Sequence, residues 1–133
     1  VDFSMAAGEF VEVYAKAEER GSWDVVATCY FIDTAKNVLR YLEVINHVLP
    51  VGGWWVNVGP LLWHFEQDRI PSVELTLDEL LSLLAHCGFE LEEQRTLSPQ
   101  TYTGVPHSML THHYVPEFWV CRKVRHHSMA PSV

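Results

Sequence analysis

Two polar side chains stand just beyond apolar runs of the chain. Asp33 follows residues 24–32 (DVVATCYFI), and His64 comes a few residues after residues 54–58 (WWVNV). Near-continuous runs of β-branched and aromatic residues are typical of strands that are buried in a parallel sheet. In such sheets, ligands bind beyond the carboxyl ends of the strands. A carboxylate and an imidazole at two such ends therefore predict a polar ligand pocket.

A helix is expected between these two strands. Apolar residues recur at helical spacing over residues 38–49, and a proline and two glycines within residues 50–53 end the pattern. Asp33 and Thr34 would supply the oxygen that caps the start of this helix. Asp33 thus has two alternative roles, a helix cap and a carboxylate that faces a ligand. The two roles are compatible, and we expect both.

The second half of the chain adds a helix and two strands. Thr76 and Glu79 form a capping box that opens the helix, and Gly88 is placed to end it. Strands are expected over residues 89–96 and 117–124, joined without a helix, so that they form an antiparallel hairpin at the sheet edge. Two strand–helix–strand steps precede the hairpin and imply right-handed parallel crossovers. The fold class is α/β, resembling the C-terminal half of the Rossmann-like, seven-stranded methyltransferase sheet.

Composition indicates a globular protein and disfavours several partners. Hydrophobic residues make up 48% of the 133 residues, which is enough for a core, and 17 acidic against 9 basic residues give a formal charge of −8. Nucleic acid is disfavoured because its phosphates need a basic face. No apolar stretch approaches the roughly 18 residues of a membrane span. The three cysteines form no CxxC pair, so we expect a cytoplasmic protein, with the nucleus as a second location.

Three segments resemble the carnosine N-methyltransferase family. They are residues 6–10 (AAGEF), 27–37 (ATCYFIDTAKN) and 52–66 (GGWWVNVGPLLWHFE), and the likeness covers most of residues 2–124. It implies a class I enzyme that uses S-adenosyl-L-methionine to methylate an imidazole nitrogen of carnosine or a related histidine dipeptide, giving an anserine-type product. Residues 1–124 would be the C-terminal part of this methyltransferase domain, and residues 125–133 a disordered tail.

The resemblance assigns Asp33, His64, Tyr102 and Tyr114 to substrate binding. Asp33 matches the family's aspartate that binds the substrate imidazole, which makes it the catalytic residue. Alkylation needs a free lone pair on one ring nitrogen. A carboxylate that accepts the N–H of the other nitrogen fixes the tautomer and stabilises the growing positive charge. From pattern alone, His64 would be a structural histidine, and both tyrosines would be buried residues with satisfied hydroxyls.

Glu9, Phe10 and Cys29 are the cofactor-binding residues that the resemblance implies. In class I methyltransferases, the loop after the third strand places an acidic residue near the adenine amino group and an apolar residue against the ring. The family pattern is Gly-Asp-Phe, whereas this chain has Gly8-Glu9-Phe10, which keeps the acceptor but changes its reach. The alternatives are a solvated turn acid for Glu9 and a core thiol for Cys29.

The connection over residues 97–116 is long for a compact domain, which is typical of a functional or disordered loop. Relatives carry tyrosines where this chain has His112 and His113, so its substrate preference could differ. The histidines of this region lack partners at metal-ligand spacing, and methyl transfer from a sulfonium needs no metal. We therefore expect no metal site.

No GxGxG loop can be assembled from the seven glycines. In the family, that loop and the acidic residue that binds the ribose belong to the first two strands, which would precede Val1. A sheet without its N-terminal strands would expose an apolar edge and one open face. Two alternatives to the dipeptide enzyme follow: a catalytically incomplete fragment or interaction module, and a methyltransferase of peptide or protein histidines. In the intact protein, we expect a small-molecule dipeptide as partner and allow for a homodimer.

Overall fold

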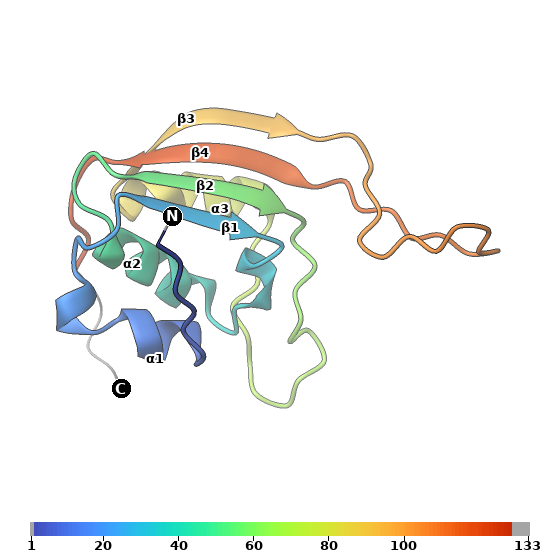
Figure 1. The fold of residues 1–133 in the computed structure, drawn as a ribbon, viewed down its shortest axis with the longest axis horizontal. Helices are drawn as coiled ribbons and strands as arrows, with labels where there is room; N and C mark the ends of the chain where they lie inside the picture. The colour runs from blue at the N-terminus through green and yellow to red at the C-terminus, as the bar shows by residue number, and fades with distance from the viewer. Residues whose placement is uncertain (1, 129–133) are drawn as a thin grey trace.

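The chain forms one four-stranded sheet with its helices on a single side (Figure 1). The computed structural model describes residues 2–128. Across the sheet the strand order is β1–β2–β4–β3, with β1 parallel to β2 and β4 antiparallel to both of its neighbours. The strands are β1 (Val25–Cys29), β2 (Trp54–Gly59), β3 (Phe89–Thr96) and β4 (Glu117–Lys123). The last strand therefore lies inside the sheet, and β1 and β3 are its edges.

This arrangement confirms the predicted α/β class, with parallel strands followed by an antiparallel hairpin. The helices of the described residues are α1 (Phe10–Tyr14), α2 (Val38–Val48) and α3 (Leu77–His86), with 3-10 turns η1 (Ala17–Glu19) and η2 (Ile32–Thr34). The first strand is shorter than predicted. It ends at Cys29 because Tyr30 has a φ of +50°, after which the backbone turns into η2 instead of continuing as a strand to residue 32.

The prediction that Asp33 caps the helix after β1 is wrong. The cap of α2 is Asn37, whose side chain accepts a hydrogen bond from the Leu39 N–H at 3.1 Å. Asp33 lies in η2, one turn earlier, where its side chain is buried. Aspartate and asparagine are both good helix caps. Asn37 caps α2 because the tight turn after β1 places Asp33 in η2, before the helix begins. The Asp33 carboxylate therefore does not cap α2.

The sheet is covered by helices on one face and open on the other. Along β4, buried residues alternate with half-buried ones, and the inner row includes Trp119, which packs edge-on against Trp55 of β2 at 5.7 Å between ring centroids. On the open side, Val25 of the β1 edge is 53% exposed and Trp54 is 40% exposed. The expected apolar edge and open face are therefore present in the described residues.

The connection between β3 and β4 extends well away from the sheet (Figure 1). Its two arms meet where the backbones of Gln100 and Tyr114 exchange two hydrogen bonds of 2.8 Å each. At the other end of the sheet, residues 125–127 are hydrogen-bonded to α2 and to the end of α3. Of the expected tail, residues 129–133 lie outside the described residues.

Gly88, as predicted, follows the end of α3, and its substitution provides a test of this packing. Its φ is +86°, and a Cβ there would collide with the Arg125 carbonyl oxygen. We expect Gly88→Ala to lower the free energy of unfolding by roughly 1–3 kcal/mol for backbone strain, with a further loss from the clash. Gly52→Ala is the matched control, because Gly52 has a φ of +90° with no atom within 4 Å. Equal losses in chemical denaturation would contradict the proposed contact.

Candidate active site

Asp33 is positioned by the turn that follows β1, and its carboxylate is only half used. The Oδ2 atom accepts a hydrogen bond from the Leu62 backbone N–H at 3.0 Å. The Oδ1 atom is buried and has no hydrogen-bond partner within the described residues. Burial raises the pKa of Asp33 above its ordinary value, although the Leu62 N–H, the nearby His64 and the backbone N–H of Asp33 itself oppose the shift. Unpaired buried acceptors are rare and costly, so this oxygen is suited to accept a donor from a ligand.

His64 lies directly against the Asp33 turn. Its backbone N–H donates to the Asp33 carbonyl oxygen at 3.2 Å, and its ring Nδ1 lies 3.0 Å from the same oxygen. A carbonyl oxygen can only accept, so Nδ1 carries the proton. In the neutral ring, Nε2 is then left as an acceptor. The sequence suggested that these two residues share a pocket, but it gave no sign that the backbone of Asp33 fixes the tautomer of His64.

A cavity of about 120 Å³ brings together all four residues that the resemblance assigned to the substrate. Its lining residues are Tyr30, Asp33, Pro60, Leu62, His64, Tyr102 and Tyr114. The two tyrosines reach it from the long connection between β3 and β4. Aromatic faces next to an unpaired carboxylate oxygen make a site suited to a flat ring that carries an N–H donor or a positive charge.

Tyr30 is a cavity residue that sequence reasoning missed. Its ring lies 5.5 Å from that of Tyr102 and 5.8 Å from that of Tyr114, measured between centroids. The left-handed φ of +50° is unusual for an aromatic residue, and such strain is concentrated at functional sites. A 2.8 Å hydrogen bond from the Tyr30 N–H to the Val58 carbonyl oxygen stabilises this backbone conformation. The only signal in the sequence was its place near the end of the apolar run, three residues before Asp33.

The expected cofactor residues divide between a second cavity and the surface. Phe10 and Cys29 both line an apolar cavity of about 450 Å³ that follows the free edge of β1. The Phe10 ring packs against Phe31 and Tyr41, at 5.1 and 5.0 Å between centroids. Glu9 does not line this cavity. It is exposed at the start of α1, where its Oε2 accepts a hydrogen bond from the Glu12 N–H at 2.8 Å.

The two cavities are separated by the turn at the end of β1. Cys29 and Phe31 line the apolar cavity, whereas Tyr30 and Asp33 line the polar one. Strand alternation alone would place residues 29, 31 and 33 on one face, and the turn that begins at Tyr30, where φ is +50°, moves the Asp33 side chain to the polar cavity instead. Residues 29–33 therefore line both cavities.

Two further observations concern other kinds of site. Within residues 2–128, no group of three or more His, Cys, Asp or Glu side chains is arranged to hold a metal ion. Over the same residues, no helix has the length and apolar character needed to cross a membrane.

The fold is that of S-adenosylmethionine-dependent methyltransferases. A SAM-dependent methyltransferase from Methanosarcina mazei matches with a TM-score of 0.55 and 17% identity, over 79% of this chain and 61% of that one. The antibiotic-resistance methyltransferase Kmr matches with a TM-score of 0.51 and 14% identity, over 83% of this chain and 57% of its own. At these identities the likeness concerns the fold alone.

Sequence relatives identify the family. The family model for carnosine N-methyltransferase matches residues 1–125. The carnosine N-methyltransferase of Schizosaccharomyces pombe is 47% identical over 131 residues, and that of Rattus norvegicus is 42% identical over 123. These alignments cover 91% and 92% of this chain but only 35% and 30% of the relatives. The chain belongs to the carnosine N-methyltransferase family, as the resemblance suggested, and it spans about a third of the length of these relatives.

Proposed function

We propose that the full-length protein uses S-adenosylmethionine to methylate an imidazole nitrogen of carnosine or a related histidine dipeptide, giving an anserine-type product. The observation that carries the proposal is the buried Oδ1 atom of Asp33, which has no hydrogen-bond partner within residues 2–128 and belongs to a side chain that lines a cavity together with three tyrosines. An imidazole N–H is a donor of the right size and shape for this position. The family match supports the substrate class, and the fold supports the methyl donor.

In this proposal Asp33 acts on the ring that is methylated. Its Oδ1 accepts the N–H of one imidazole nitrogen and so leaves the lone pair of the other nitrogen free for attack. When bound, S-adenosylmethionine supplies an electrophilic methyl group on a sulfonium. The ring becomes positively charged as the N–CH₃ bond forms and the sulfur takes back the electrons of the broken S–CH₃ bond. The carboxylate stabilises that charge, and its raised pKa suits it to receive the N–H proton afterwards.

The other cavity residues hold the ring in line with the donor. Tyr30, Tyr102 and Tyr114 offer aromatic faces that stabilise a cationic ring, and His64 offers Nε2 to a donor of the substrate. Positioning of this kind accounts for much of the rate of a transfer between two bound molecules.

The residues of the apolar cavity fit part of the methyl donor. Phe10, Phe31 and Cys29 present ring carbons and a thiol to the cavity, which suits an adenosyl group. Glu9 is proposed to contact the adenine amino group from the start of α1. Residues 2–128 contain no glycine loop for the amino-acid end of the donor, so this function is proposed for the full-length protein. A homodimer and a location in cytoplasm and nucleus stay predictions.

The size of the polar cavity favours one further candidate. At about 120 Å³ it has room for an imidazole ring and little more, so the rest of the substrate would lie outside. A histidine side chain of a peptide or protein could enter it in the same way. The acceptor would then be selected by the connection between β3 and β4, which contributes Tyr102 and Tyr114 to the cavity.

A labelling experiment tests the proposal and separates the two acceptors. We expect full-length protein to transfer the labelled methyl group of S-adenosylmethionine to carnosine, with mass spectrometry placing it on the imidazole. β-Alanylalanine, which lacks the ring, is the matched control and should stay unlabelled. Label in a histidine peptide but not in carnosine would favour the alternative acceptor. No label in either would contradict the proposed activity.

A further inference from the structure

The segment between β2 and α3, residues 60–75, carries His64 and runs outside the helices and strands (Figure 1). Two of its backbone N–H groups, those of Leu62 and His64, donate to Asp33. The acceptor side of the proposed site is therefore built from a connection that must be held in place by side chains. We call residues 60–75 the β2–α3 connection.

Lys36 holds this connection at three points. Its Nζ lies 2.7 Å from Asp68 Oδ2 and 5.2 Å from the centroid of the Phe65 ring. Its carbonyl oxygen accepts a hydrogen bond from the Val73 N–H at 3.0 Å. Lys36 follows Asp33 by three residues, so the same short stretch supplies the catalytic carboxylate and the group that holds the opposite wall of the site.

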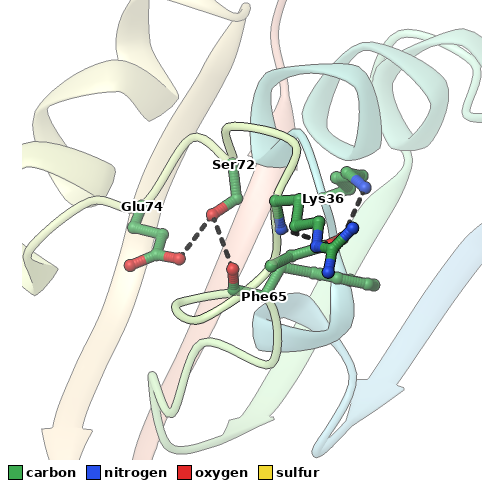
Figure 2. A network of polar contacts seen from close by, with 6 residues as sticks. Lys36, Phe65, Ser72 and Glu74 are labelled. Atoms are coloured by element: carbon green, nitrogen blue, oxygen red, sulfur yellow. Dashed lines mark hydrogen bonds and ion pairs between the residues drawn. The ribbon is translucent and has the colours of Figure 1, made fainter.

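The connection is also tied to itself around Phe65. Figure 2 shows Ser72 between the Phe65 carbonyl oxygen and the Glu74 carboxylate. The Ser72 Oγ lies 3.5 Å from the former and 2.5 Å from the latter. These contacts close the connection into a loop, with the Phe65 ring presented to the Lys36 ammonium. The lysine thus contacts a preformed surface of one ring and one carboxylate.

We infer that Lys36 is a positioning residue: its ammonium, held by the Asp68 carboxylate and the Phe65 ring, keeps the β2–α3 connection against η2 so that His64 and the Leu62 N–H reach Asp33. Both side chains of the ion pair are more than a third exposed, and exposed pairs are weak. We call the contact of the Lys36 ammonium with Asp68 and Phe65 the latch. Because it is weak, the latch can open, and substrate can enter while it is open. The effect on substrate binding rests on the proposed function, whereas the effect on the connection does not.

Three variants of the full-length protein separate charge from chain length. Lys36→Met keeps the aliphatic chain and removes the charge, Lys36→Arg keeps the charge, and Lys16→Met removes an exposed lysine elsewhere. In Lys36→Met we expect the Leu62 and His64 amides to exchange with solvent about fivefold faster, as suits the loss of one exposed ion pair and one cation–π contact. Core amides such as that of Trp55 should be unchanged, and Lys36→Arg should restore protection.

The kinetic readout is a selective rise in the KM for carnosine. Lys36→Met should raise it about fivefold with kcat and the KM for S-adenosylmethionine unchanged, since the connection does not line the apolar cavity. Equal amide exchange in Lys36→Met and wild type would overturn the latch. Faster exchange with an unchanged KM would overturn its role in substrate binding. If wild-type protein does not methylate carnosine at all, the proposed function fails, while the exchange experiment still decides whether the latch exists.

Discussion

Asp33→Ala is expected to abolish methylation of carnosine by the full-length protein while binding of S-adenosylmethionine persists. The substitution removes the only unpaired buried carboxylate oxygen among the described residues, and it also leaves the Leu62 N–H without its acceptor. The donor should still bind, because the Asp33 side chain lines the tyrosine cavity and not the cavity of Phe10 and Cys29. Calorimetry with the donor and single-turnover assays with the dipeptide measure the two effects separately.

Asp33→Asn makes the test sharper because it preserves the shape of the side chain. Its amide oxygen can still accept from Leu62, and the NH₂ group then faces the cavity as a donor. The imidazole would be held with its lone pair toward residue 33 and its N–H toward the methyl group, which is the unreactive tautomer. We expect turnover to fall by roughly 10²–10³-fold, the size of the loss when a charge-stabilising group is removed.

The control for both variants is Asp24→Asn, which changes an exposed aspartate immediately before β1 and should leave turnover unchanged. The pH profile gives a further check. Burial raises the pKa of Asp33, so its protonation should reduce turnover at a higher pH than an ordinary carboxyl would. Undiminished turnover in Asp33→Ala would mean that another group binds the imidazole.

Local signals were sufficient to predict α3 and β3. The capping box at Thr76 is present with both of its hydrogen bonds, and β3 has the predicted bounds. These features depend on contacts within a few residues, which the sequence states directly. The pairing of β4 with β2 depends instead on contacts between distant segments. A hairpin pattern predicts that β3 and β4 are neighbours, but it does not say which of them lies at the edge.

The errors and omissions lie around the turn after β1, where tertiary contacts override local preference. Residues 30–32 are aromatic and β-branched, as in a strand, yet the backbone turns at Tyr30. Gly59, at the end of β2, lies close to Tyr30: a Cβ added to Gly59 would be 3.0 Å from the Tyr30 Cα. The turn is therefore packed against the end of β2. Asp33 is buried as a result and leaves the cap to Asn37. The pattern of the sequence singled out Asp33 and His64, the resemblance added Tyr102 and Tyr114, and the geometry that joins them required the structure.

Lys123→Met is expected to lower the free energy of unfolding by roughly 2–4 kcal/mol, the cost of leaving two buried carbonyls without donors. Lys123 is fully buried at the end of β4. Its Nζ donates to the carbonyl oxygens of Asn46 and Leu49, at 2.6 and 2.7 Å, where α2 ends. The carboxyl end of a helix favours a positive group. The buried lysine therefore joins the inner face of the sheet to the helix that covers it.

Arg122→Met is the matched control for this substitution. Arg122 precedes Lys123 on the same strand, but it points to the open face and pairs there with Glu90 and Glu92. Exposed pairs contribute about 0–1 kcal/mol, so its loss should be much smaller. Similar losses for the two variants in urea denaturation would contradict a special role for the buried lysine.

The loss caused by Lys123→Met should also depend on pH in a defined direction. Burial lowers the pKa of Lys123 from 10.5 to about 8 in the folded protein. Between those two values the unfolded chain binds more protons at this position than the folded one, so the contribution of Lys123 to stability rises with pH. The gap between wild type and Lys123→Met should therefore be wider at pH 9.5 than at pH 7. A gap that stays constant would mean that the two carbonyl contacts of Nζ keep the ammonium charged throughout, and that the lysine acts as an ordinary cation at the end of α2.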